Sequence, residues 1–185
     1  RKLYMEIFRK YQLDAKRTCV DLGDLKLNLS HMVLGIISEN EEYLKAIVEN
    51  DMVNAKEEQA DMLWYLANYC NFRNFNFDEI VGNPYSMDYD LENFEEKVSV
   101  YEVFSSRLAD CVKKFIAYGK PLNEELEKKC IKLLVWSITI EDTAFDFNTD
   151  LEKNVNKLRQ RFPEKFTREK ALNRDLNAER KILES

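Results

Sequence analysis

The distribution of apolar and polar positions predicts a chain built of helices. Apolar residues recur at helical spacing over residues 1–20, which predicts an amphipathic first helix. They are Leu3, Ile7, Phe8, Tyr11 and Ala15. The polar stretch 21–24 interrupts this pattern, and Asn28 or Ser30 can cap the helix that follows.

The segment from His31 to Phe72 predicts two buried helices joined by a tight turn. Its two halves are apolar almost all round, and helices of that kind are buried. Between them lies a polar break, Glu49-Asn50-Asp51-Met52, at which an antiparallel hairpin can turn. We therefore expect a helical hairpin whose turn lies near Asp51.

Further helices are predicted beyond this hairpin. Residues 72–89 are rich in aromatic and turn residues, which predicts a loop with a short helical turn near Asp78 to Val81. Two longer helices are expected over Leu91 to Ala117 and Asn123 to Phe145, because a glycine and a proline mark a turn between them.

From Leu151 the chain is predicted to form a basic C-terminal segment. Its first helix is expected to end at Phe162-Pro163, because the residue before a proline is disfavoured in the helical region. Thr167 can cap a final amphipathic segment. The apolar residues of that segment are Phe166, Leu172, Leu176 and Ile182.

Composition narrows the fold class. The 185 residues include only 4 Gly and 3 Pro, whereas 34% are charged. This balance indicates an all-α protein and leaves no Gly-rich phosphate loop, which excludes Rossmann and P-loop folds. The length suits one domain or a compact duplicated unit. We expect a helical bundle built on the acidic hairpin.

The net charge and the apolar content limit which kinds of partner and which cellular location are expected. The formal net charge of −6 argues against a general nucleic-acid binder. No apolar run approaches the ~18 residues of a membrane span, and the N-terminal residues are too charged for a signal peptide. Four cysteines without a C-x-x-C pair predict buried thiols. We therefore expect a cytoplasmic protein with a small partner, no nucleic acid and no membrane.

Two pairs of carboxylates interrupt the apolar hairpin. Glu39 and Glu42 are three residues apart, as are Glu58 and Asp61, so each pair shares one helical face. A lone pair of this kind arises by chance among 34 acidic residues and is usually solvated. Here both pairs lie in apolar helices on either side of one turn. Their all-oxygen ligand set favours Mg²⁺ or Mn²⁺ and disfavours zinc.

Several segments of the sequence, including the stretch from Tyr11 to Thr18, resemble one enzyme family. The E-x-x-E and E-x-x-D motifs of the MazG-like all-α nucleoside triphosphate pyrophosphohydrolases occur here in L-G-I-I-S-E-N-E-E-Y-L-K-A-I and E-E-Q-A-D-M-L-W-Y-L-A. The family segment that reaches the substrate phosphates is similar to N-V-N-K-L-R-Q-R-F-P-E-K-F. Dimeric all-α dUTPases are related to this family.

The resemblance implies a role for each of these residues. The family's metal ligands correspond to the four carboxylates Glu39, Glu42, Glu58 and Asp61. Glu39 or Glu42 can also take the proton of the attacking water. The phosphate-binding residues correspond to Asn154, Lys157 and Arg161, whose spacing places them on one helical face. His31, the single histidine, is either a base or ribose contact or an ordinary residue of a helix start.

A second hairpin weakly repeats the first. With an offset of about 70 residues, EEYLKAIV aligns with ADCVKKFI and ADMLWYLA aligns with KLLVWSIT, which indicates an internal duplication. Arg107 and Asp110 stand where the first copy has Glu39 and Glu42. The second copy is therefore expected to have lost its metal site.

The chain is expected to form one all-α domain over residues 1–185. It would comprise a metal-binding half (1–85), a degenerate repeat (86–150) and a basic C-terminal segment (151–185). Apolar hairpins of this kind need more cover than one chain supplies. We therefore expect a homodimer or a higher homo-oligomer.

These inferences converge on one reaction. We expect Mg²⁺-dependent hydrolysis of a nucleoside triphosphate to a monophosphate and pyrophosphate, in control of the nucleotide pool. Two alternatives are a hydrolase of the same fold specific for dUTP or dUDP, and a non-catalytic nucleotide-binding or scaffold protein. A ferritin-like di-iron protein fits less well, because it requires E-x-x-H pairs and His31 lies in none.

Overall fold

The computed structural model describes residues 2–86, 94–138 and 143–185, and these residues form helices without any strand. The expected all-α fold is confirmed. The helices are α1 (Lys2–Thr18), α2 (Leu25–Val48), α3 (Met52–Arg73), α4 (Phe77–Val81), α5 (Phe94–Tyr118), α6 (Glu124–Ile138), α7 (Thr149–Arg161), α8 (Arg168–Leu172) and α9 (Leu176–Glu184).

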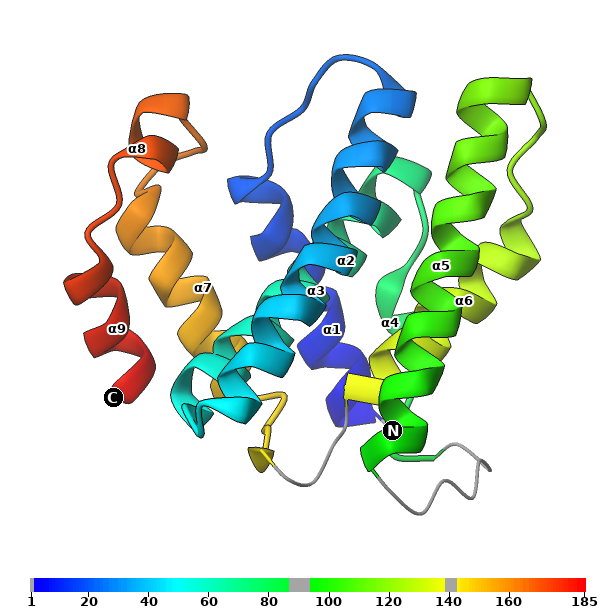
Figure 1. The fold of residues 1–185 in the computed structure, drawn as a ribbon. Coiled ribbons are helices and arrows are strands. Elements are labelled where there is room, and N and C mark those ends of the chain that lie inside the picture. The colour runs from blue at the N-terminus through cyan, green and yellow to red at the C-terminus, as the bar shows by residue number, and fades with distance from the viewer. Residues whose placement is uncertain (1, 87–93, 139–142) are drawn as a thin grey trace.

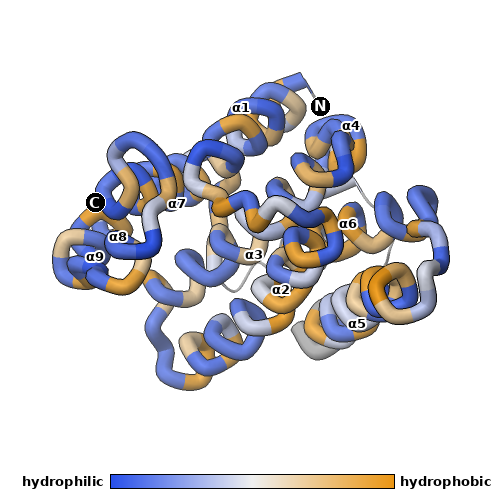
Figure 2. The backbone as a smooth tube through the Cα atoms, turned by 90° about the horizontal axis from the view of Figure 1, so that it is seen from above, coloured by the Kyte–Doolittle hydropathy of each residue, from blue (hydrophilic) through white to orange (hydrophobic). Residues whose placement is uncertain are grey.

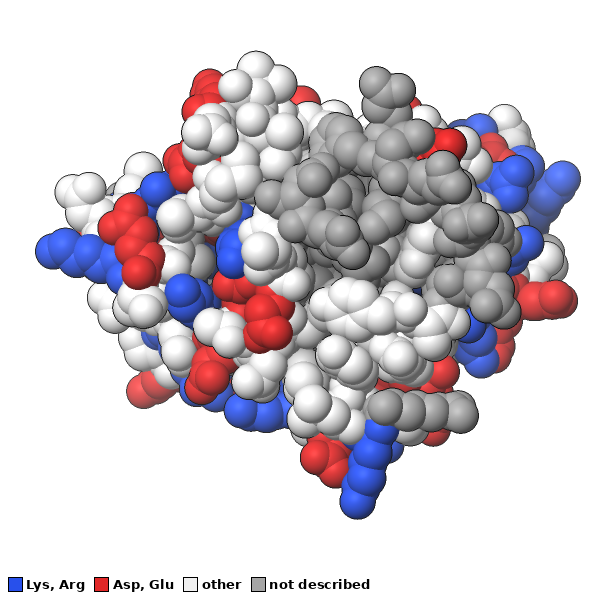
Figure 3. Space-filling view, turned by 90° about the horizontal axis from the view of Figure 1, so that it is seen from below, with Lys and Arg blue, Asp and Glu red and all other residues white. Residues whose placement is uncertain are grey.

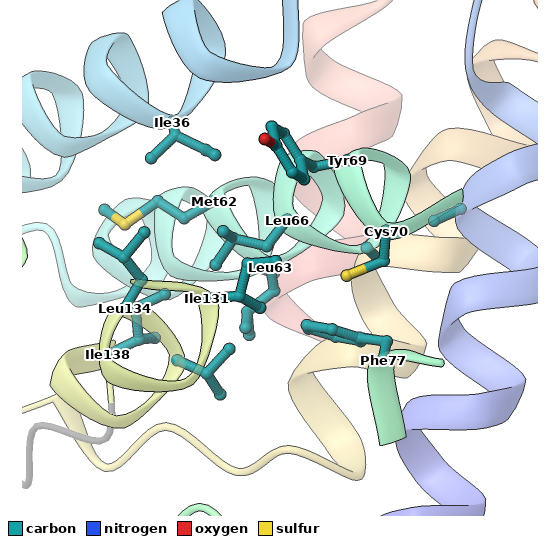
Figure 4. Packing of buried hydrophobic residues seen from close by; sticks show 14 of the residues in the cluster. Ile36, Met62, Leu63, Leu66, Tyr69, Cys70, Phe77, Ile131, Leu134 and Ile138 are labelled. Carbon is teal, nitrogen blue, oxygen red and sulfur yellow. The ribbon is translucent and has the colours of Figure 1, made fainter. Parts of the chain in front are cut away.

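Helix α3 lies at the centre of the molecule. It contacts α1, α2, α6, α7 and α9. Figure 1 shows α7, α8 and α9 on one side of the α2–α3 pair and α5 and α6 on the other. Buried side chains of α3, such as Leu63 and Leu66, pack against Ile36 of α2, Leu134 of α6 and Phe77 of α4 (Figure 4). Hydrophobic residues gather where α2, α3, α5 and α6 come together (Figure 2).

Helix α2 begins earlier than the sequence predicted. Asp24 is its N-cap, and the Asp24 side chain accepts a hydrogen bond from the backbone N–H of Leu27. Asn28 lies inside the helix, where its side chain bonds Asp21 and the backbone of Leu22. The prediction that Asn28 or Ser30 caps this helix is therefore wrong, because the cap is provided by Asp24, directly after Gly23.

The turn between α2 and α3 forms where the polar break predicted it. Asn50 adopts a positive φ of 57°, a conformation that asparagine tolerates better than most residues. Asp51 then caps α3 by accepting a hydrogen bond from the backbone N–H of Asn54. The expected antiparallel hairpin is confirmed. Its turn places the acidic motif of α2 beside the acidic motif of α3.

The second hairpin covers the first. Helix α5 packs on α2 and on α6, and the Tyr101 hydroxyl of α5 donates to the carbonyl of Ile36 at 2.7 Å. The predicted extension of the second helix of this hairpin to Phe145 is wrong. Helix α6 ends at Ile138, and Phe145 lies outside any helix. The predicted start near Leu91 lies outside the described residues. That this hairpin duplicates the first stays a prediction.

The C-terminal segment forms two helices after α7. The predicted end of α7 before Phe162-Pro163 and the cap at Thr167 are both confirmed, because α7 ends at Arg161 and Thr167 accepts from the backbone N–H of Lys170. The single amphipathic segment expected afterwards is instead split, and Asp175 caps α9. Leu172 is exposed in this arrangement.

Charged side chains of both signs share the surface, and none of the four cysteines is exposed. Acidic and basic side chains lie next to one another over the described part of the face shown in Figure 3. Cys70 and Cys130 are buried and Cys19 and Cys111 are half-buried, and all four are free thiols. Among the described residues, none of the helices combines the length and hydrophobicity needed to cross a membrane.

Candidate metal centre and active site

The α2–α3 hairpin brings three of the four predicted ligands together. Glu39, Glu58 and Asp61 each offer a carboxylate oxygen, and these oxygens lie within 4.8 Å of one another. Glu42 is not part of this group, but it lines the same cavity. The antiparallel packing of two helices thus converts motifs nineteen residues apart into one acidic cluster.

Burial and mutual repulsion change the protonation of this cluster. Burial, followed by the negative charge of Asp61, raises the pKa of Glu39 and of Glu58. A hydrogen bond between the two carboxyl groups lowers the pKa of Glu39 and raises that of Glu58. The two carboxyl groups therefore retain a proton as a pair more readily than either would if it were exposed to solvent.

Two side chains of α7 form hydrogen bonds with Asp61. Asn154 Nδ2 donates to Asp61 Oδ1 and Lys157 Nζ donates to Asp61 Oδ2, both at 2.6 Å. The Tyr11 hydroxyl in turn donates to Asn154 Oδ1 at 2.9 Å, which fixes the orientation of the amide. Both oxygens of Asp61 are thus bound by side chains of α7.

Lys157 is an internal cation. Its side chain is 1% exposed and also donates to Glu57 Oε1 at 2.9 Å. Burial alone lowers the pKa of Lys157, but the charges of Asp61 and Glu57 and their hydrogen bonds outweigh burial, so the pKa is raised. Lys157 therefore carries a positive charge that balances the acidic cluster.

The predicted phosphate-binding residues are placed differently from one another. Asn154 and Lys157 are fully buried against Asp61. Arg161, one turn further along α7, lines the cavity that contains the acidic cluster. In this structure Arg161 is the member of the three that reaches the cavity wall.

An aromatic wall, formed by His31, Trp64 and Tyr65, lines the same cavity as the carboxylates, which has a volume of about 250 Å³. His31 lies edge-on to Tyr65, with ring centroids 5.8 Å apart, and Trp64 Nε1 donates to Thr18 Oγ1 at 3.0 Å. Burial lowers the pKa of His31, and its Nδ1 is buried without a hydrogen-bond partner among the residues that the structure describes. The predicted base or ribose contact thus lies beside the acidic cluster, inside α2 rather than at its start.

The donor set of the cluster fits a hard divalent cation. Oxygen ligands of Mg²⁺ lie about 3 Å apart when adjacent and about 4.2 Å apart when opposite, so carboxylate oxygens that lie within 4.8 Å of one another can close on such an ion through side-chain movements alone. Three carboxylates without histidine or cysteine also match the ligand preference of Mg²⁺ and Mn²⁺. The residues present therefore suit the expected metal.

Sequence reasoning missed three residues near this site. Glu57 binds Lys157, Arg174 lines the cavity, and Glu179 binds Arg161. Glu57 stands inside the recognised E-E-Q-A-D motif, and its pairing with a lysine of α7 depends on tertiary packing. Arg174 and Glu179 belong to the C-terminal segment, where no periodic pattern identifies them.

Comparison with known proteins agrees with the hairpin. A family model described as the MazG nucleotide pyrophosphohydrolase domain matches residues 28–84, which include both acidic pairs and α2, α3 and α4 except for the first turn of α2. Neither a curated protein nor a solved structure matches the chain. The resemblance drawn from the sequence is confirmed over this segment: residues 28–84, with the acidic hairpin at their centre, are similar to the MazG nucleotide pyrophosphohydrolase domain.

Proposed function

We propose that this protein is a Mg²⁺-dependent nucleoside triphosphate pyrophosphohydrolase that acts on the nucleotide pool. Water would add to the α-phosphorus while the bond from that phosphorus to the α–β bridging oxygen breaks. The products would be a nucleoside monophosphate and pyrophosphate. The family match at residues 28–84 supports a nucleotide pyrophosphohydrolase activity in general.

The observation that carries this proposal is that acidic and basic side chains line one cavity. Three carboxylate oxygens lie within 4.8 Å of one another, and the guanidinium of Arg161 lines the same cavity. Carboxylates alone would repel a triphosphate, whereas carboxylates with a divalent cation attract it. An acidic cluster beside an arginine therefore suits a metal–polyphosphate complex.

Each residue of the site has a defined task in this reaction. Glu39, Glu58 and Asp61, with Glu42 from the same cavity, would hold Mg²⁺, which when bound supplies charge neutralisation and favours ionisation of water. Glu39 or Glu42 would take the proton of the attacking water.

The remaining polar residues position these groups. Asn154 and Lys157 hold Asp61 in place through both of its oxygens, and their predicted contact with phosphate remains part of the proposal. Arg161 would stabilise the charge that develops on the leaving pyrophosphate. His31 and the aromatic wall offer a surface for the base or ribose.

The test is a hydrolysis panel over canonical and modified NTPs and dNTPs, with dUDP included, that resolves pyrophosphate from orthophosphate. Pyrophosphate release that requires Mg²⁺ and is lost in Glu58→Gln is expected. Glutamine resembles the protonated Glu58 side chain, so this variant should fold. Turnover restricted to dUTP and dUDP would indicate the narrower hydrolase. No turnover by folded, Mg²⁺-binding protein would contradict the proposal and favour a nucleotide-binding or scaffold role.

We also propose that residues 1–185 form one domain and that the protein assembles as a homodimer or a higher homo-oligomer in the cytoplasm. Several large apolar side chains of α1 and α2 support an assembly surface. They include Leu3, Leu13, Leu34, Ile37 and Val48, which are exposed in the single chain. Light scattering at micromolar concentration would contradict the assembly if it gave a monomer mass.

A further inference from the structure

The C-terminal segment brings a second guanidinium to the candidate site. Arg174 lies in the short connection between α8 and α9, directly before the Asp175 cap. It lines the same cavity as Arg161 and the acidic cluster. A residue outside the recognised motifs thus reaches the place where the polyphosphate would lie.

One buried carboxylate holds both arginines. Glu179 of α9 is 3% exposed. Arg161 donates to it from Nε and Nη2 at 2.8 and 2.6 Å, and Arg174 donates from Nη2 at 2.8 Å and from Nε at 3.3 Å. Two guanidinium groups and one carboxylate leave one net positive charge at the cavity wall. This arrangement orients both arginines before any ligand binds.

Each guanidinium keeps donors for a ligand. An arginine side chain has five N–H donors, and the bonds to Glu179 use Nε and Nη2 of Arg161 and of Arg174. Within the described residues, neither Nη1 group donates to a protein acceptor at hydrogen-bond distance. The Arg161 and Arg174 side chains are 15% and 40% exposed, so both are reachable from the cavity.

We propose that Arg161 and Arg174, oriented by Glu179, form a clamp for the terminal phosphates of the substrate. Arg174 is then a further substrate-binding residue, and Glu179 is a positioning residue that acts through the two arginines. This inference rests on the proposed function and adds a specificity to it. Since two guanidinium groups suit two adjacent phosphates, the clamp favours polyphosphates over a monophosphate.

The test measures binding of inorganic pyrophosphate to the full chain in the presence of Mg²⁺ by calorimetry. Arg174→Gln removes one of the two guanidinium groups. It is expected to raise the Kd for pyrophosphate about tenfold or more, because hydrogen bonds to charged groups are strong. Arg174→Lys keeps the positive charge but lacks the paired N–H donors of a guanidinium, so it should give an intermediate Kd for pyrophosphate. Binding of Mg²⁺ alone should be unchanged in both variants.

Arg180→Gln is the matched control on α9. Arg180 donates to Asp51 at 3.0 and 3.1 Å and does not line the cavity. This variant weakens the attachment of α9 to the hairpin and is expected to keep the wild-type Kd for pyrophosphate. Glu179→Gln should raise the Kd for pyrophosphate but leave the Kd for a nucleoside monophosphate unchanged. A merely structural role of Glu179 would weaken both ligands together.

The outcomes separate this inference from the proposed function. The proposed clamp is overturned if the Kd for pyrophosphate of Arg174→Gln equals that of the wild-type protein and of Arg180→Gln. This holds even when the wild-type protein hydrolyses nucleotides. It is also overturned if the wild-type protein does not bind pyrophosphate. Protein that binds pyrophosphate through Arg174 but turns over no nucleotide supports the clamp and contradicts the proposed hydrolase.

Discussion

The protonation of Glu39 and Glu58 makes the stability of the metal-free protein depend on pH. A carboxyl group with a raised pKa binds more protons in the folded state than in the unfolded state, so stability falls as pH rises. Burial, followed by the charge of Asp61, raises the pKa of Glu39 from 4.5 to about 7, and Glu58 shifts in the same direction. The melting temperature of metal-free protein should therefore fall between pH 4.5 and 7.

Glu58→Gln provides the control for this pH dependence. The variant keeps the hydrogen bond to Glu39 without an ionisable group, so its melting temperature should fall less over the same pH range. Saturating Mg²⁺ should stabilise wild-type protein at pH 7 and have little effect on the variant. Equal pH dependence of the two proteins would show that the cluster does not control stability.

Lys157 should stabilise the fold by balancing the cluster. Lys157→Met leaves Asp61 and Glu57 without their internal cation, and breaking a buried ion pair costs about 3 kcal/mol. Because Mg²⁺ can replace the lost positive charge, it should stabilise Lys157→Met more than it stabilises wild type. Chemical denaturation with and without Mg²⁺ measures both effects.

Lys153→Met is the comparison on the same helix. Lys153 donates to the carbonyl of Leu183 and has no carboxylate partner at that contact. Its replacement should cost well under 1.5 kcal/mol, as for a single hydrogen bond. If Mg²⁺ stabilises Lys157→Met no more than Lys153→Met, the interpretation of Lys157 as an internal cation is wrong.

At the scale of elements, the approach of α2 to α3 depends on Gly35. A Cβ at this position would lie 2.2 Å from a ring carbon of Tyr65. Overpacking costs about 1–3 kcal/mol, whereas alanine in a helix gains about 1 kcal/mol over glycine. Gly35→Ala should therefore be destabilised by about 1 kcal/mol, with the Tyr65 ring displaced into the cavity.

A double-mutant cycle checks this contact. In a Tyr65→Ala background the clash is absent, so Gly35→Ala should become neutral or stabilising through helix propensity. Urea denaturation of the four proteins measures the sign. A Gly35→Ala effect that is the same in both backgrounds would mean that Tyr65 does not determine how closely the helices approach.

The boundaries of the elements were predictable where a local signal was unique. Asn50 and Asp51 interrupt an apolar sequence, so the hairpin turn followed from the sequence. The start of α2 did not, because Asp24, Asn28 and Ser30 are all capable caps and the choice depends on how the chain enters from α1.

At the scale of the whole molecule, the sequence predicted the parts of the site that lie on one hairpin. Glu39, Glu58 and Asp61 meet because two regular helices pack antiparallel, and their spacing predicts that the two motifs face each other but not that Glu42 stays outside the group. The pairing of Glu57 with Lys157 and of Glu179 with two arginines depends on how α7 and α9 dock. Docking of separate helices leaves no periodic signal in the sequence, so these partners could only come from the structure.

A buried ion pair joins the two hairpins and bears on whether the chain is one domain. Glu127 of α6 is fully buried, and it accepts hydrogen bonds from Arg73 at 2.7 and 2.9 Å and from the Tyr69 hydroxyl at 2.6 Å, both on α3. Glu127→Gln removes the charge that Arg73 requires, which should cost about 3 kcal/mol. Glu124→Gln on the exposed face of α6 should cost less than about 0.5 kcal/mol.

Calorimetry of these two variants tests the single-domain hypothesis. Helices α3 and α6 share one hydrophobic core, so unfolding of either hairpin exposes the buried face of the other. Glu127→Gln should therefore lower the temperature of one cooperative transition that includes both hairpins. A variant that instead shows two transitions, with only one of them shifted, would mean that the second hairpin unfolds as a separate unit. Because Glu124→Gln carries the same chemical change on the same helix, its unchanged transition would assign the effect to the buried contact between the hairpins.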